Sequence, residues 1–182
     1  MRRIIQVVDY DPSWPVTFAS LRANLWEAVQ GIAVSVEHVG STSVPGLAAK
    51  PIIDIDVVVA TPADMPDVIA RLATLGYVHR GNLGVEGREA FETPLGLAAH
   101  HLYACVQGGV ALKNHLTVRD ALRGNAAAAA KYGALKKQLA VQFPEDIEGY
   151  IEGKTAFLLE VLRNASFPES VLQAIGDVNR RK

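Results

Sequence analysis

The segment of residues 51–59 constrains the fold more than any other part of the sequence. After Pro51 it reads Ile-Ile-Asp-Ile-Asp-Val-Val-Val, a β-branched run interrupted only by two aspartates. Such a run is typical of a strand buried inside a sheet. Because side chains alternate across a strand, Asp54 and Asp56 must share one face. We therefore expect a sheet whose central strand carries two carboxylates on one side.

The rest of the chain predicts further strands and helices around this strand. The expected strands are residues 33–39, 77–79, 88–93 and 101–107. The expected helices run from a Ser13 cap to Gly31, from a Thr61 cap to Gly76, and through most of the chain after Leu112, with a short helix and a frayed basic end in 166–182. The fold class is therefore α/β (α+β), with a mixed sheet, flanking helices and a helical C-terminal third.

Composition excludes several functional classes. A chain of 182 residues with 49% apolar content suits one domain spanning residues 1–182. Its formal net charge is -1, so the chain lacks the excess of basic residues that binding to long nucleic acid requires. Cys105 is the single cysteine, so no intrachain disulfide is expected and a reducing cytoplasm is the expected compartment. We find no signal-peptide pattern and no apolar stretch long enough for a membrane span.

A glycine turn and the two aspartates together carry the chemistry. Gly40, Ser41 and Thr42 follow the strand of residues 33–39, and backbone amides in such a turn can approach a phosphate. Mg²⁺ binds one or two protein carboxylates together with phosphate oxygens, so Asp54 and Asp56 are the candidate metal ligands. The pattern indicates a site for a metal-bound nucleoside triphosphate. The structural alternative is a pair of solvated carboxylates.

The segment of residues 38–56 resembles the signature of GrpB proteins, a family placed in the DNA polymerase beta-like nucleotidyltransferase superfamily. It reads His-Val-Gly-Ser-Thr-Ser-Val-Pro-Gly-Leu-Ala-Ala-Lys-Pro-Ile-Ile-Asp-Ile-Asp. Later matches are His100-His101-Leu102-Tyr103, Arg119-Asp120 with Leu122-Arg123, Tyr132 with Leu135-Lys136, and Tyr150 with Lys154. The resemblance implies that Gly40 and Ser41 hold a triphosphate and that Asp54 and Asp56 bind Mg²⁺ during nucleotidyl transfer.

The chain departs from the superfamily at one point. Many superfamily enzymes add a third carboxylate from a neighbouring strand, and no acidic residue stands in the strand of residues 101–107. His101 is the candidate to replace it as ligand or base, and Glu92 is a weaker one. We expect a nucleotidyltransferase acting on a small-molecule or protein acceptor. The alternative is a catalytically inactive nucleotide- or ligand-binding regulatory module.

Basic residues outside the motif give further binding candidates. Lys50 stands beside the aspartates, Arg88 follows a glycine-rich loop, and Arg119 and Arg123 are one helical turn apart, so all are candidates to bind phosphate. A surface network is the equal alternative for the two helical arginines. Lys136 with Lys137 is interpreted as a solvated face.

Histidine and aromatic residues outside the motif are mostly assigned to packing. A zinc site built from His38, His100 and His101 is disfavoured, because adjacent strand residues face opposite sides of a sheet. Tyr132 and Tyr150 are interpreted as packing residues, with base stacking as the alternative, and Cys105 as an inert buried thiol.

Overall fold

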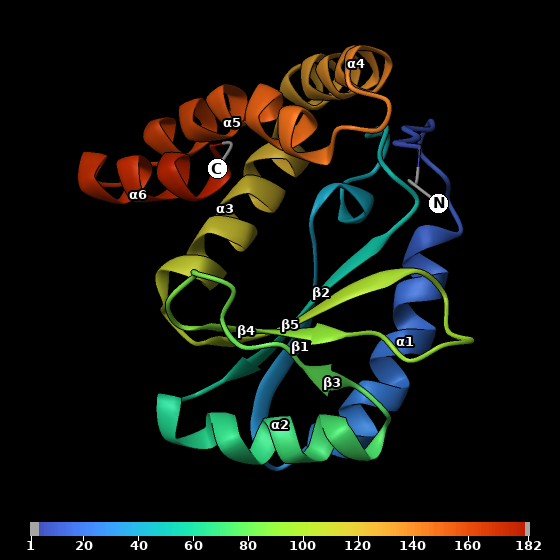
Figure 1. The fold of residues 1–182 in the computed structure, drawn as a ribbon, viewed down its shortest axis with the longest axis vertical. Coiled ribbons are helices and arrows are strands. Elements are labelled where there is room, and N and C mark those ends of the chain that lie inside the picture. Colours follow the sequence, from blue (N-terminus) through green and yellow to red (C-terminus); the bar gives the residue numbers. More distant parts are fainter. Residues whose placement is uncertain (1–3, 181–182) are drawn as a thin grey trace.

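The computed structural model describes residues 4–180, which form a five-stranded mixed sheet flanked by helices (Figure 1). The strands are β1 (Ala33–Val39), β2 (Ile53–Val59), β3 (Val78–His79), β4 (Arg88–Glu92) and β5 (His100–Val106). The helices are α1 (Trp14–Val29), α2 (Met65–Thr74), α3 (Val110–Gly124), α4 (Ala126–Gln142), α5 (Ile147–Asn164) and α6 (Glu169–Asn179), with 3₁₀ turns at Ser41–Ser43 and Pro62–Asp64. The α/β prediction is confirmed. The basic end at Arg181 and Lys182 lies outside the described residues.

Strand β2 is internal in the sheet, as its apolar sequence predicts. The strand order is β1-β2-β5-β4-β3, with β2 antiparallel to β1 and parallel to β5. Asp54 pairs with His101 of β5, and Asp56 pairs with Tyr103 of β5 and Glu37 of β1. Directly paired residues point to the same face, so this register gathers the polar side chains on one side of the sheet.

The opposite face of the sheet packs on α1 and α2 and forms the main hydrophobic core. Leu21, Leu25 and Val29 of α1 are buried there, at the helical spacing that the sequence predicts. The predicted Ser13 cap is wrong in detail: the Ser13 side chain makes no capping bond, and the Asp11 carboxylate accepts the Ser13 N–H at 2.8 Å. Thr61 does cap the next helical segment, through a capping box with Asp64.

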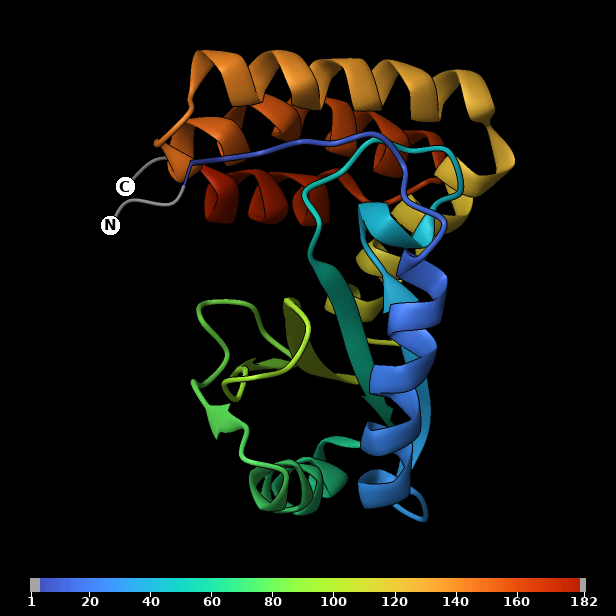
Figure 2. The same ribbon diagram turned by 90° about the vertical axis from the view of Figure 1, so that its right-hand side faces the viewer.

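The polar face of the sheet is covered by α3, which leads into a layer formed by α4, α5 and α6 (Figures 1 and 2). The N-terminal segment runs alongside this layer in an extended conformation. Ile5 N–H bonds the Pro144 carbonyl at 2.7 Å, and Val8 pairs with Ala49. Ile5 also packs with Leu139 of α4. The first described residues therefore join the helical layer to the segment before β2. No helix among residues 4–180 is long and apolar enough to cross a membrane.

Gly40 makes the turn after β1 possible. Its φ of 68° and ψ of -171° lie in a region that is essentially restricted to glycine. A Cβ at Gly40 would also overlap the Asp54 carboxylate of β2. Absence of a side chain at this position therefore lets the turn close directly against the first aspartate.

Gly40→Ala should lower the free energy of unfolding by at least about 3 kcal/mol, because strain of the backbone and overlap with Asp54 add together. Gly46→Ala is the matched control: φ is 77° there, but a Cβ would meet nothing within 4 Å, so we expect a loss of only about 1–2 kcal/mol. Urea unfolding measures both. Equal losses would contradict the role assigned to the Gly40–Asp54 approach.

Candidate functional site

A cleft of about 240 Å³ lies between the polar face of the sheet and the helices α4 and α5. Its lining residues are Ser41, Thr42, Ala49, Lys50, Ile52, Asp54, His101, Tyr103, Lys136, Tyr150, Ile151 and Lys154. A larger hollow of about 470 Å³ between α1 and α2 is lined mainly by apolar side chains, with Glu27 its only charged residue. Convergent charged groups mark a functional cleft more specifically than size does, so the smaller cleft is the candidate site.

The glycine turn forms one wall of this cleft and is held rigidly by His38. The His38 ring stacks on Phe18, with ring centroids 4.5 Å apart, and its Nε2 lies 3.0 Å from Thr42 Oγ1. Burial, together with the nearby Arg123 charge, lowers the pKa of His38 to about 4, so the ring is neutral at pH 7. Ser43 Oγ donates to the Gly40 carbonyl at 2.6 Å and closes the turn. Ser41 and Thr42 are thereby presented to the cleft.

Asp54 enters the cleft and is paired with His101. The His101 Nδ1–H donates to Asp54 Oδ1 at 2.8 Å, which leaves Nε2 of a neutral ring as an acceptor. Burial opposes ionisation of Asp54, but the His101 bond and nearby positive charges including Lys154 hold its pKa below the ordinary value. Asp54 is therefore a carboxylate at neutral pH.

Three lysines face Asp54 across the cleft. Lys136 is only 2% exposed, its Nζ has no hydrogen-bond partner among residues 4–180, and this atom lies 4.6 Å from the centre of the Tyr132 ring. Burial and the charge of Lys154 lower the pKa of Lys136 to about 7. Burial and the charge of Lys50 lower the pKa of Lys154 to about 8. The positive charges of these lysines disfavour one another, and Asp54 is the one carboxylate that lines the cleft with them.

Asp56 lies in a different environment from Asp54, although both point to the same face. It is fully buried and does not line the cleft. His115 of α3 donates its Nδ1–H to Asp56 Oδ2 at 2.7 Å, whereas Oδ1 has no partner among residues 4–180. Although burial disfavours a charged imidazole, the Asp56 carboxylate raises the pKa of His115.

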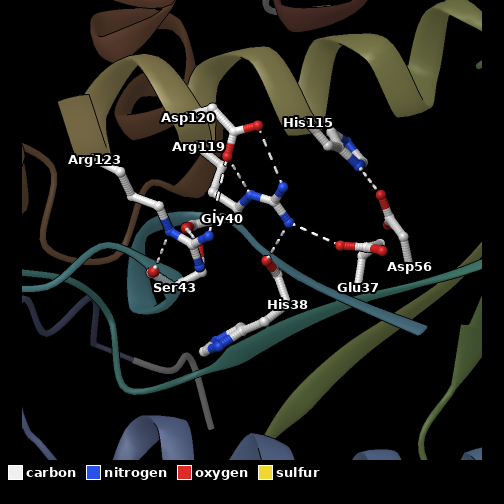
Figure 3. A network of polar contacts seen from close by, with 9 residues as sticks. All are labelled: Glu37, His38, Gly40, Ser43, Asp56, His115, Arg119, Asp120 and Arg123. Carbon is white, nitrogen blue, oxygen red and sulfur yellow. Dashed lines mark hydrogen bonds and ion pairs between the residues drawn. The ribbon is translucent and has the colours of Figure 1, made fainter. Parts of the chain in front are cut away.

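Arg119 and Arg123 connect α3 to the sheet and to the glycine turn (Figure 3). Arg119 donates to Glu37 Oε2 at 2.9 Å, to the His38 carbonyl at 3.3 Å, and to the neighbouring Asp120. Arg123 donates to the Ser43 carbonyl at 3.0 Å. Neither arginine lines the cleft, so both hold the turn from behind it.

Three other residues discussed from the sequence, Arg88, Glu92 and His100, do not line the cleft. The Arg88 guanidinium stacks 4.5 Å from the centre of the Tyr103 ring. Glu92 forms an exposed ion pair with Arg80. His100 points away from His101, as predicted, and bonds the Tyr77 hydroxyl at 2.7 Å.

Of the tyrosines assigned to packing, Tyr132 stacks on Phe157 and is fully buried. Tyr150 is also buried, but it reaches the cleft. Lys50 and Lys154 lie over its ring, at 5.7 and 5.4 Å from the ring centre.

Sequence reasoning missed two parts of the site. Lys136 was interpreted as a solvated residue, but its spacing of four from Tyr132 places it on the buried side of α4. His115 is the second, because nothing in the local sequence of α3 signals its partner Asp56, 59 positions earlier. The positions of both residues at the site follow only from the packing of α3 and α4 on the sheet.

Comparison with known proteins is consistent with this architecture. Residues 4–164 match the family model described as GrpB protein. The UPF0157 protein YqkA of Bacillus subtilis is 33% identical over 164 residues, which are 90% of this chain and 48% of YqkA, so the chain spans about half the length of that relative. The crystal structure of conserved protein GrpB from Enterococcus faecalis matches with a TM-score of 0.78 and 33% identity, over 92% of this chain and 98% of that chain.

A more distant match relates the fold to nucleotidyltransferases. A structure of the Cid1 poly(U) polymerase bound to MgATP has a TM-score of 0.50 and 13% identity, over 72% of this chain and 46% of that chain. At this identity the likeness establishes the fold alone.

His115→Gln should destabilise the protein by about 2 kcal/mol at pH 6, because Gln cannot carry the charge that faces Asp56. The raised pKa of His115 means that the contribution of the charge is complete below pH 6.5 and is lost as pH rises through the folded-state pKa. The difference between wild type and variant should therefore shrink by pH 9. Urea unfolding across this pH range measures it, with His79→Gln, at the exposed His79–Glu89 pair, as control. Parallel pH profiles for wild type and His115→Gln would refute the charged pair.

Proposed function

The chain belongs to the GrpB family, and from this premise we propose that it is a Mg²⁺-dependent nucleotidyltransferase acting on a small-molecule or protein acceptor. The nucleoside triphosphate binds in the cleft between the sheet and α4–α5, with its phosphates between the glycine turn and the lysines. The proposal rests on the family, on the nucleotidyltransferase-like fold, and above all on the charges that line this cleft.

The single observation that carries the proposal is the buried amino group of Lys136, which has no hydrogen-bond partner in the described part of the chain. Lys50 and Lys154 line the same cleft, so the lysines outnumber the one carboxylate, Asp54. A triphosphate supplies several negative charges in a row, which fits cations arranged along one wall. The backbone amides of Ser41 and Thr42 and the Ser41 hydroxyl lie at the cleft as further donors to phosphate oxygens.

One carboxylate fits the Mg²⁺ that the superfamily fold implies. Asp54 reaches the cleft and can offer an oxygen there, whereas Asp56 is fully buried and does not line the cleft. Oxygen ligands of this type, completed by phosphate oxygens, suit a hard cation. When bound, the ion supplies charge stabilisation to the phosphate that is transferred.

His101 is the group placed to accept a proton. Its Nδ1–H is held by Asp54, so its Nε2 lone pair is available at the cleft. In the proposed reaction an acceptor hydroxyl attacks the α-phosphorus, its proton passes to His101 Nε2, and the bond to the bridging oxygen breaks as pyrophosphate leaves. Lys136 and Lys154 face the phosphates and balance the charge of the leaving group.

A second candidate function is a nucleotide- or ligand-binding regulatory module without catalysis. It is favoured by His101, which stands opposite Asp54 where the superfamily resemblance leads one to expect a third carboxylate. Among residues 4–180, the cluster of metal-ligating side chains consists of Asp56, Cys105 and His115 rather than three carboxylates. Binding of the triphosphate is common to both candidates, and product formation separates them.

Mg²⁺ with ATP, CTP, GTP or UTP should raise the melting temperature of the wild-type protein for at least one nucleotide. At about 100 times the dissociation constant the shift should be about 5–10 °C. Asp54→Asn and Lys136→Met should each remove most of it, because they delete the cleft carboxylate and the buried cation. Lys131→Met, an exposed change on the same helix α4, should leave it intact. Thermal unfolding measures all four proteins.

Absence of a shift with every nucleotide would refute the site. Where a nucleotide binds, its α-phosphate-labelled form is incubated with the protein and a metabolite extract. A labelled product that is lost in His101→Gln, while nucleotide binding persists, supports the transferase. Binding without any labelled product supports the regulatory module.

Affinity for tripolyphosphate should fall as pH rises from 7 to 9, by up to about tenfold per pH unit for each proton taken up. The reason is that the pKa of free Lys136 is about 7, so the lysine must gain a proton to bind the anion at higher pH. Lys136→Arg, which stays charged, should show a shallower fall. Titration calorimetry measures both proteins, and their comparison cancels the ionisation of the ligand itself. Identical pH slopes would contradict the role of Lys136.

A further inference from the structure

A second cluster of polar side chains lies beneath the cleft. Asp56 of β2, Cys105 of β5 and His115 of α3 each bring one potential donor atom, and these atoms all lie within 4.8 Å of one another. Asp56 and Cys105 are fully buried, and the His115 side chain is 23% exposed. The register of the sheet explains why Cys105 lies near Asp56. Cys105 pairs with Val58, which is two residues after Asp56 and on the same face of β2.

The bonds within the protein leave this cluster incomplete. Asp56 Oδ1 is buried and has no hydrogen-bond partner among residues 4–180. Burial raises the pKa of the Cys105 thiol, and the charge of Asp56 and a weak hydrogen bond to that carboxylate raise it further. A buried carboxylate oxygen without a partner costs free energy, so such an atom in a native fold calls for a ligand. His115 of α3 donates to the other carboxylate oxygen, Oδ2 (Figure 3).

The donor set selects a class of ion. Thiolate sulfur, imidazole nitrogen and carboxylate oxygen together suit Zn²⁺ and neighbouring transition metals, whereas Mg²⁺ takes oxygen ligands. We propose that Asp56, Cys105 and His115 form a binding site for a Zn²⁺-class transition-metal ion. Three protein ligands leave one position of a tetrahedral ion open.

Charge balance supports a divalent ion at this place. Binding releases the thiol proton of Cys105 to solvent, and His115 binds as the neutral imidazole. The carboxylate and the thiolate then offset the two positive charges of the ion. The guanidinium of Arg88, whose charge acts on both Cys105 and His115, therefore faces a neutral centre.

This site is separate from the proposed nucleotide site, although the two share strand β2. The ion at Asp56 requires no nucleotide, and the phosphates in the cleft face Asp54 and the lysines. Asp54→Asn should therefore remove nucleotide binding and keep the transition metal. The two proposals can fail independently.

Co²⁺ is the spectroscopic probe for the test, because a Co²⁺–thiolate bond gives a charge-transfer absorption in the near ultraviolet. The full-length protein, stripped with a chelator, should bind one equivalent of Co²⁺ with this band, and Zn²⁺ should displace the ion and bleach the band. Cys105→Ser should abolish the band and weaken Zn²⁺ at least about tenfold. His115→Gln should weaken Zn²⁺ similarly, while Asp54→Asn and His79→Gln should bind Zn²⁺ as wild type does.

The near-isosteric Cys105→Ser change makes misfolding distinguishable from loss of a ligand, since its far-ultraviolet circular dichroism and metal-free melting curve should match those of wild type within a few degrees. A Co²⁺ spectrum without a thiolate band would overturn the site. Equal Zn²⁺ affinity in wild type and Cys105→Ser would also overturn it, as would the absence of any Zn²⁺ binding by wild type.

Discussion

The hydrogen bond between Asp56 and His115 is the contact on which the arrangement of the molecule depends. It lies between the internal strand β2 and α3, and its carboxylate is completely buried. Removing either partner would leave a polar group in the interior without compensation, so the bond fixes the position of α3 on the sheet. Arg119 and Arg123 extend this attachment to Glu37 and to the glycine turn. The turn, the aspartates and the helical layer are therefore held in one mutual geometry.

The same strand places its two aspartates in contrasting surroundings. Asp54 faces a cleft rich in lysine, whereas Asp56 faces imidazole and thiol groups in the interior. Alternation along β2 guarantees only that both carboxylates point to one side of the sheet. The neighbouring elements decide the rest: α4 and α5 bring cations to the first, and α3 brings His115 to the second. The helices that cover this short motif thus give its two carboxylates different chemical environments.

The sequence predicted the sheet better than the site. The β-branched run around Asp54 fixed an internal strand, and Gly40 marked the turn, because these signals are local. Ser13 occupies the predicted N-cap position of α1, but its side chain makes no capping bond, and its own N–H is bonded by the Asp11 carboxylate. The roles of His115 and Lys136 depend on contacts between distant segments, and no periodicity within one helix reveals what that helix will face. The GrpB resemblance includes Lys50, Lys136 and Lys154, but only the packing of α4 and α5 on the sheet shows that these three lysines line one cleft.

The extended N-terminal segment around Ile5 has a consequence for the order in which the protein folds. Ile5 contacts Pro144 and Leu139, so residues from the beginning of the chain complete a small core built by its last third. During synthesis the sheet and α1 can form early, whereas the contacts of Ile5 can form only after α4 and the start of α5 have been made. Contacts so distant in sequence close slowly, because the entropy of loop closure is lost before packing repays it. The cationic cleft is consequently among the last features of the molecule to acquire its final shape, after most of the chain has been made.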